Sequence, residues 1–110
     1  MKLIDRNTLQ QRLGRVTLVE ALPEKYYRDG HLPGAKHLPH DQVRQLAPAL
    51  LAHKDAAIVV YCASATCQNS HIAARVLEQL GYADVAVYAG GKQDWQEAGL
   101  ALEKGAAVAA

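Results

Sequence analysis

The chain has 110 residues, of which 50% are apolar and 21% charged, a composition that predicts one globular domain and excludes a disordered chain. Twelve Lys and Arg residues against eleven Asp and Glu residues leave a net charge of +1, so we expect neither nucleic acid nor a membrane as a partner. The longest apolar run, 56–63, is too short to span a bilayer. No secretory signal follows the first residues, and two cysteines cannot form a disulfide framework. We therefore expect a cytoplasmic protein with reduced thiols.

The first half of the chain predicts short elements joined by turns. In order, they are a helix capped by Asn7 or Thr8 and ending at Leu13, a strand over 16–20, a helix that starts at Pro23, and a loop over 30–35. Asp41 can cap a further helix with apolar residues at helical spacing, although Pro48 shortens or kinks it.

The second half of the chain carries the clearer pattern. Residues 57–61 form a short, nearly all-apolar strand, which is typical of a strand buried on both faces of a parallel sheet. Apolar residues over 72–80 recur at helical spacing up to Gly81, and 85–88 is a second apolar strand. Strand, helix and strand with short links form a right-handed βαβ unit. The sequence therefore predicts an α/β domain over 1–104 with a mainly parallel sheet, and a frayed tail over 105–110.

Cys62 directly follows the buried strand and precedes a loop of small residues that leads into a helix near Ser70. This places Cys62 at the carboxyl edge of the sheet, facing free backbone N–H groups at a helix start. Such a setting favours a thiolate, so we expect the pKa of Cys62 to lie below that of a free thiol and the residue to be a nucleophile. The alternative is a buried structural thiol.

Three segments in order around this cysteine resemble one known family. Residues 27–39 resemble a pattern Y-x-x-G-H-I-P-G-A-x-x-x-P, and 58–62 resemble a strand that ends in a catalytic cysteine. Residues 87–100 resemble L-x-G-G-x-x-x-W-x-x-x-G-x-P through their glycines and Trp95. Together they are similar to the rhodanese-like family of sulfurtransferases, over most of the chain. The resemblance implies a single domain with a sheet of about five strands and helices on both faces.

The resemblance also implies the chemistry. Cys62 is the expected nucleophile: it takes a sulfane sulfur from thiosulfate or a persulfide, carries it as a persulfide, and gives it to a thiol, cyanide or protein acceptor. No cofactor and no metal ion are implied. The loop amides and side chains are expected to bind the substrate, and the residues concerned are Ala63, Ser64, Ala65, Thr66, Cys67, Gln68, Asn69 and Ser70.

The loop departs from the family pattern Cys-x-x-Gly-x-Arg-Ser. It is about two residues longer, lacks the glycine, and has Cys67 or, counting the longer loop, Gln68 in place of the arginine. Family members also carry Asp-x-Arg where this chain has 20–22, Glu-Ala-Leu. Because a guanidinium fork binds anionic oxygens in pairs, we expect a weak hold on thiosulfate and favour a persulfide or protein donor.

Several alternatives stay open. Cys67 either resolves the Cys62 persulfide or receives its sulfur, or it packs as a small apolar residue. The domain is then either a sulfurtransferase or a catalytically altered module for binding or redox sensing through both cysteines. A phosphatase or arsenate reductase of the same fold is disfavoured by the missing arginine. A metal site at Cys62, Cys67 and His71 is disfavoured by its irregular spacing.

For four further residues, we consider whether the role is structural or chemical. His71 either contacts a bound anion or faces solvent, and His31 is expected to fix its loop by hydrogen bonds. Lys92 is expected to be solvated, the alternative being a charge near the site. Trp95 is expected to pack the last helix.

Overall fold

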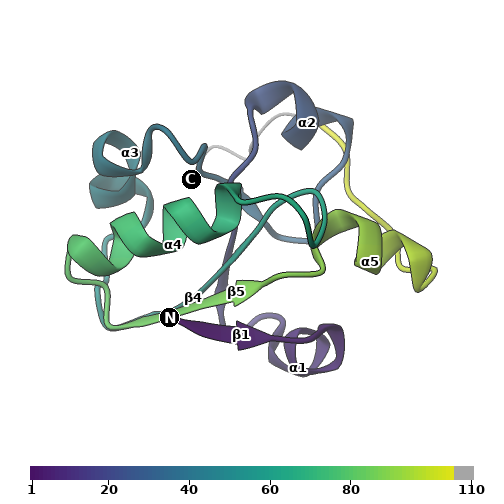
Figure 1. The fold of residues 1–110 in the computed structure, drawn as a ribbon, viewed down its shortest axis with the longest axis horizontal. Helices are drawn as coiled ribbons and strands as arrows, with labels where there is room; N and C mark the ends of the chain where they lie inside the picture. Colours follow the sequence, from purple (N-terminus) through teal and green to yellow (C-terminus); the bar gives the residue numbers. More distant parts are fainter. Residues whose placement is uncertain (106–110) are drawn as a thin grey trace.

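Five parallel strands form one sheet in the order β1-β5-β4-β2-β3 (Figure 1). The computed structural model describes residues 1–105. Its strands are β1 (Lys2–Ile4), β2 (Thr17–Glu20), β3 (Lys36–His37), β4 (Ala57–Tyr61) and β5 (Asp84–Tyr88). The central strand, β4, pairs with β2 on one side and β5 on the other. The predicted α/β fold with a parallel sheet is confirmed.

Helices cover both faces of the sheet, as an all-parallel sheet requires. They are α1 (Arg6–Arg12), α2 (Glu24–Asp29), α3 (Val43–Leu50), α4 (Asn69–Gln79) and α5 (Gly91–Glu97). In Figure 1, α3 and α4 lie on one side of the sheet and α1 on the other. The arrowheads of β1 and β5 point toward the end of the molecule that carries α5 and the loop between β4 and α4.

The side chains of β4 alternate between two apolar cores, because successive residues of a strand point to opposite faces. Ile58 and Val60 join Leu77 of α4 in one buried cluster. Val59 and Tyr61 join a second cluster, which contains Leu9 of α1, Tyr27 of α2 and Trp95 of α5. The sheet is therefore buried on both faces, and the chain leaves it at the carboxyl edge of β4 directly into the cysteine loop.

Two predicted helix caps are wrong. The side chain of Asp5, rather than Asn7 or Thr8, caps α1 by accepting a hydrogen bond from the Thr8 N–H at 2.8 Å. Asp41 does not cap α3, which begins after Gln42 without a side-chain cap. The observed cap position lies two or three residues before the expected one in α1 and one residue after it in α3. Only a residue in the cap position can reach the free N–H groups.

The two edge strands, β1 and β3, are absent from the sequence-based prediction, since two or three residues carry no readable alternation. The predicted tail, 105–110, lies outside the described residues except for Gly105. Within residues 1–105, none of the helices has the length and apolar content needed to cross a membrane.

Candidate active site

Cys62 lies where predicted, at the carboxyl end of β4, and α5 holds its backbone in place. The Lys92 N–H donates to the Cys62 carbonyl at 3.0 Å, and the Gln93 N–H donates to the Ala63 carbonyl at 2.9 Å. Gly91 has a φ of +65°, and a Cβ built on it would lie 2.4 Å from the Cys62 carbonyl oxygen. The close approach of α5 to the cysteine loop therefore depends on a glycine.

The Cys62 thiol is enclosed rather than open to solvent. The residue is 1% exposed, and its Sγ lies 3.3 Å from both the Cys67 carbonyl oxygen and Ser70 Oγ, the two hydrogen-bond partners of the thiol. Its surroundings are thus polar on one side, which differs from a thiol held only by aliphatic packing.

The prediction that the pKa of Cys62 lies below that of a free thiol is wrong, because the shift has the opposite direction. Burial raises the pKa of the Cys62 thiol, and its hydrogen bond to the Cys67 side chain adds to the rise, against the opposing hydroxyl and N–H of Ser70. A thiolate is costly here because the low dielectric penalises its charge and few donors replace the lost water.

Cys67 occupies the more favourable position for a thiolate. It is half-buried, and its neighbours Thr66 and Gln68 are exposed. Burial opposes the charge, but the hydrogen bond from the Cys62 thiol and the backbone N–H groups of Ala63 and Asn69 outweigh it and lower the pKa of Cys67. The sequence predicts that backbone N–H groups of the loop stabilise a thiolate on Cys62. Two of these groups instead favour a thiolate on Cys67.

The rest of the predicted binding loop runs around these two thiols. Ala63, Ala65, Thr66 and Gln68 are exposed, Ser64 and Asn69 are half-buried, and Ser70 is buried. Ser64 Oγ and Thr66 Oγ1 lie 3.1 Å apart, and the Cys67 N–H closes a turn onto the Ser64 carbonyl at 3.1 Å. Helix α4 begins at Asn69, one residue earlier than expected, and His71 lies in its first turn.

Both cysteines are free thiols. Within the part of the chain that the structure describes, no three His, Cys, Asp or Glu side chains group closely enough to hold a metal ion, and this includes the set of Cys62, Cys67 and His71. Thiol chemistry is therefore what the arrangement offers.

A buried ion pair beneath the loop is missed by sequence reasoning. Glu20 is 0% exposed, and its Oε1 accepts from Lys92 Nζ at 3.0 Å and from the Tyr61 hydroxyl at 2.8 Å. Lys92 Nζ also donates to the Tyr26 carbonyl at 2.6 Å. Burial raises the pKa of Glu20, although the hydrogen bond and charge of Lys92 oppose the rise.

The solvated lysine expected at position 92 is therefore wrong: its side chain is 12% exposed. It folds inward because Glu20 ends a buried strand and needs a cation. A glutamate that closes an apolar strand is the one sequence signal that points to this pair. Glu20 Oε2 is buried and has no hydrogen-bond partner among residues 1–105.

His31 and Trp95 have the structural roles expected of them. The His31 ring stacks on Tyr27 with centroids 3.9 Å apart, and its Nδ1 bonds to the Tyr27 carbonyl at 2.9 Å. The His31 backbone pairs with Glu103. Trp95 is 3% exposed and donates from its ring N–H to the Ala101 carbonyl. These contacts close the second core around the site.

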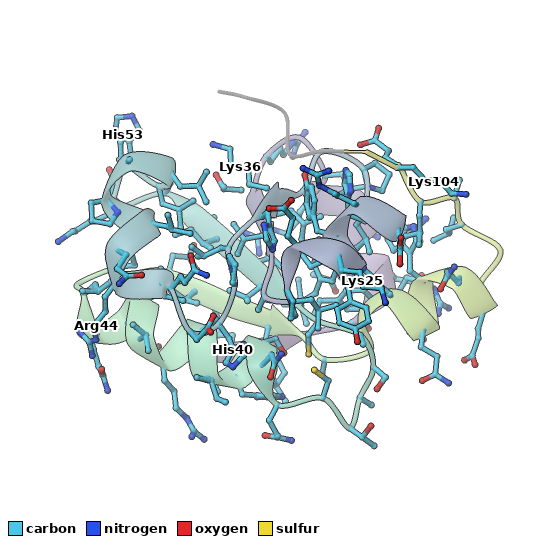
Figure 2. The ribbon with its side chains drawn as sticks, turned by 90° about the horizontal axis from the view of Figure 1, so that it is seen from above. Lys25, Lys36, His40, Arg44, His53 and Lys104 are labelled. Carbon is cyan, nitrogen blue, oxygen red and sulfur yellow. The ribbon has the colours of Figure 1, made fainter. Side chains whose placement is uncertain are left out.

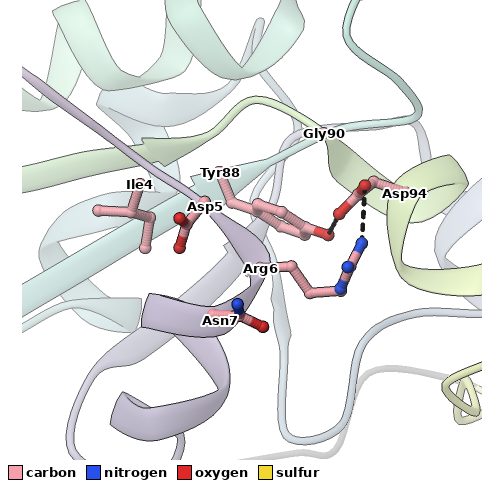
Figure 3. Close-up of a pocket in the computed structure, with 7 residues that line it drawn as sticks. All are labelled: Ile4, Asp5, Arg6, Asn7, Tyr88, Gly90 and Asp94. Carbon is pink, nitrogen blue, oxygen red and sulfur yellow. Dashed lines mark hydrogen bonds and ion pairs between the residues drawn. The ribbon is translucent and has the colours of Figure 1, made fainter. Parts of the chain in front are cut away.

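A separate cavity of about 390 Å³ lies at the same edge of the sheet, between the starts of α1 and α5 (Figure 3). Three of its polar side chains are paired with one another, since Arg6 and the Tyr88 hydroxyl both bind the Asp94 carboxylate. No residue of the cysteine loop lines it. Basic side chains such as Lys25, Arg44 and Lys104 are spread around the molecule (Figure 2), as the net charge of +1 implies.

Two curated proteins are similar in sequence to most of this chain. The chain is 33% identical over 99 residues to the HTH-type transcriptional regulator Rv0324 of Mycobacterium tuberculosis, covering 90% of this chain and 42% of that protein. It is 31% identical over 118 residues to the sulfur carrier protein TtuD of Thermus thermophilus, covering 94% of this chain and 41% of that protein. The chain thus spans less than half the length of these curated relatives.

Solved structures share the fold. A thiosulfate sulfurtransferase from Pseudomonas aeruginosa superposes with a TM-score of 0.83 at 26% identity, covering 96% of this chain and 20% of that one. The human single-domain sulfurtransferase TSTD1 superposes with a TM-score of 0.78 at 22% identity, covering 88% and 96%. The sequence model of the Rhodanese-like domain matches residues 5–98. The chain belongs to the rhodanese-like domain family.

Proposed function

We propose that this domain moves a sulfane sulfur from a donor to a thiol or cyanide acceptor and carries it as a persulfide on Cys62. The observation that carries the proposal is the position of Cys62 Sγ, at the carboxyl edge of a parallel sheet and 3.3 Å from Ser70 Oγ at the start of α4. Ligands of parallel sheets bind beyond this edge. The family and its sulfurtransferase relatives support the same chemistry.

The half-reactions balance without a further oxidant. A thiolate of the loop attacks the outer sulfur of the donor, the sulfur–sulfur bond of the donor breaks, and the donor leaves as a thiolate or sulfite. An acceptor thiolate or cyanide then attacks the outer sulfur of the enzyme persulfide and releases the loop thiolate. This is a two-step exchange in which the domain alternates between a thiol and a persulfide.

Among the described residues, the hydrogen-bond partners of Cys62 Sγ carry no positive charge, and Lys92 is already paired with Glu20. A dianion such as thiosulfate would thus rely on backbone and hydroxyl donors alone. We therefore propose a persulfide, on a small molecule or a protein, as the preferred donor. Two free thiols also suit a reducing compartment such as the cytoplasm.

Intact mass measurement tests the proposal. The reduced protein is incubated with thiosulfate and, separately, with cysteine persulfide, and we expect one added sulfur that a thiol acceptor removes. A His53→Ser variant, changed at an exposed position after α3, is the control. If reduced, folded protein gains no sulfur from either donor, the proposal is wrong.

A second candidate is a redox-sensing module, and the contact of the Cys62 thiol with the Cys67 backbone, at 3.3 Å from its carbonyl oxygen, favours it. Peroxide would oxidise the two thiols to one disulfide and be reduced to water. Mild peroxide should then give a Cys62–Cys67 disulfide that dithiothreitol reverses. Sulfonic acid on either cysteine without that disulfide would contradict this candidate.

A further inference from the structure

The two thiols of the loop differ in how a donor can reach them. Cys62 is 1% exposed and closed in by the Cys67 carbonyl and Ser70 Oγ. On the backbone side, Gly91 lies close to the Cys62 carbonyl oxygen, and the Lys92 N–H donates a hydrogen bond to it. Cys62 is therefore the less accessible of the two thiols.

Cys67 is the more accessible of the two thiols. It is half-buried and lies between the exposed residues Thr66 and Gln68. The N–H groups of Ala63 and Asn69 and the Cys62 thiol lower the pKa of Cys67. Since the thiolate is the nucleophile, both access and charge favour Cys67.

We propose that Cys67, not Cys62, is the first thiol to take the sulfane sulfur, and that it passes this sulfur to Cys62. The proposal rests on the proposed function and reverses the order that the family resemblance implies for the two cysteines. It makes Cys67 a catalytic residue rather than a packing or resolving one.

Each step balances. The Cys67 thiolate attacks the outer sulfur of a persulfide donor, the donor bond between its two sulfurs breaks, and the donor leaves as a thiolate. Cys62 then attacks the outer sulfur of the Cys67 persulfide, and the proton of the Cys62 thiol moves to the departing Cys67 sulfur. The Cys62 thiol lies 3.3 Å from the Cys67 carbonyl oxygen, so the two residues are already in contact. No oxidant or reductant is consumed.

The order of the two steps is tested with one equivalent of cysteine persulfide. The wild-type protein, Cys62→Ser, Cys67→Ser and the His53→Ser control are quenched with an alkylating agent at increasing times. Trypsin leaves both cysteines in one peptide, 55–75, so fragment ions between positions 62 and 67 assign the sulfur.

We expect Cys62→Ser to take one sulfur on Cys67 and to keep it there, because the thiol that would receive it is absent. We expect Cys67→Ser to take sulfur at least about tenfold more slowly than the His53→Ser control, because its remaining thiol is enclosed and protonated. In the wild type the sulfur should map to Cys67 first and to Cys62 later, a result that needs no substitution and stands even if a variant folds poorly.

If Cys67→Ser takes sulfur at the control rate while Cys62→Ser takes none, or if the wild-type sulfur is on Cys62 at the earliest time, the order is overturned and the proposed function stands. If no form of the protein takes sulfur, the proposed function itself fails.

Discussion

Glu20 and Lys92 set the charge balance beneath the cysteine loop. The carboxylate is completely buried, and the lysine is its only cation within 4.0 Å among the described residues. Removing one partner of a buried pair leaves an uncompensated charge, whereas removing both is often neutral. The pair therefore constrains which substitutions the site tolerates.

We expect Lys92→Met to lower the free energy of unfolding by about 3 kcal/mol at neutral pH, measured by urea denaturation. Adding Glu20→Gln to this variant should restore most of the loss, because a neutral amide needs no cation and still accepts from Tyr61. If the double variant is as unstable as Lys92→Met, the loss comes from packing and not from charge.

The same pair predicts a pH dependence. The pKa of Glu20 is raised in the folded state, so the folded protein binds this proton more tightly than the unfolded chain does. Its contribution to stability is present below the unfolded pKa and is lost as the pH rises through the folded one. The penalty of Lys92→Met should therefore shrink on acidification and be small once Glu20 is protonated in both the folded and the unfolded chain.

The two thiols should titrate in a fixed order. Burial raises the pKa of Cys62, while hydrogen bonds lower that of Cys67. We expect iodoacetamide to label Cys67 at lower pH than Cys62. Labelling across a pH series, followed by peptide fragmentation, measures the extent at each cysteine. Labelling of Cys62 first would contradict the structure of the loop.

At the scale of elements, α5 acts as a clamp on the segment after β4. Gly91 allows the approach because a side chain there would overlap the Cys62 carbonyl oxygen at 2.4 Å. Gly99 has a similar φ of +81° but no atom within 4 Å of its added Cβ. The two glycines thus separate the effect of backbone strain from the effect of contact.

Gly91→Ala should both destabilise the protein and slow sulfur uptake, because the loop must shift to admit the methyl group. Gly99→Ala should cost only the strain of a left-handed residue, about 1–2 kcal/mol, and leave the uptake rate unchanged. The comparison uses thermal denaturation and the mass assay. Equal uptake rates in the two variants would show that α5 does not position the loop.

The elements also show what sequence patterns can and cannot predict. The apolar run 57–61 predicts the position of β4, because a strand buried on both faces is apolar throughout. The helical spacing of apolar residues predicts α4, whose start lies within one residue of the expected one. The caps at Asp41 and Asn7 fail because several polar residues stand together and only the backbone turn selects one. The edge strand β1 is too short to carry a pattern.

Site prediction divides along the same line. The rule that ligands bind at the carboxyl edge of a parallel sheet places the cysteine loop correctly. The direction of the Cys62 pKa and the pair of Glu20 with Lys92 depend on how distant segments pack, which spacing along the chain does not encode.

At the scale of the whole molecule, one sheet separates two apolar cores that must form together. Leu77 belongs to the core under α4, whereas Leu9 and Trp95 belong to the opposite one. Because every central strand contributes to both, neither core is complete without the other. The domain should therefore unfold as a single unit.

We expect Leu77→Ala to lower stability by about 2–5 kcal/mol and to shift the unfolding transition seen by Trp95 fluorescence by as much as that seen by circular dichroism. Leu9→Ala, on the face that holds Trp95, is the matched variant. Two separate transitions in either variant would show that the cores are independent.

The outer strands of the sheet, β1 and β3, are three and two residues long and each contains a lysine. Unpaired backbone groups at a sheet edge invite strand addition, and short, charged edges discourage it. The domain thus offers almost no template for another polypeptide to extend the sheet. A protein that hands over or collects sulfur must meet it through side chains around the loop, and copies of the domain should resist polymerising at high concentration.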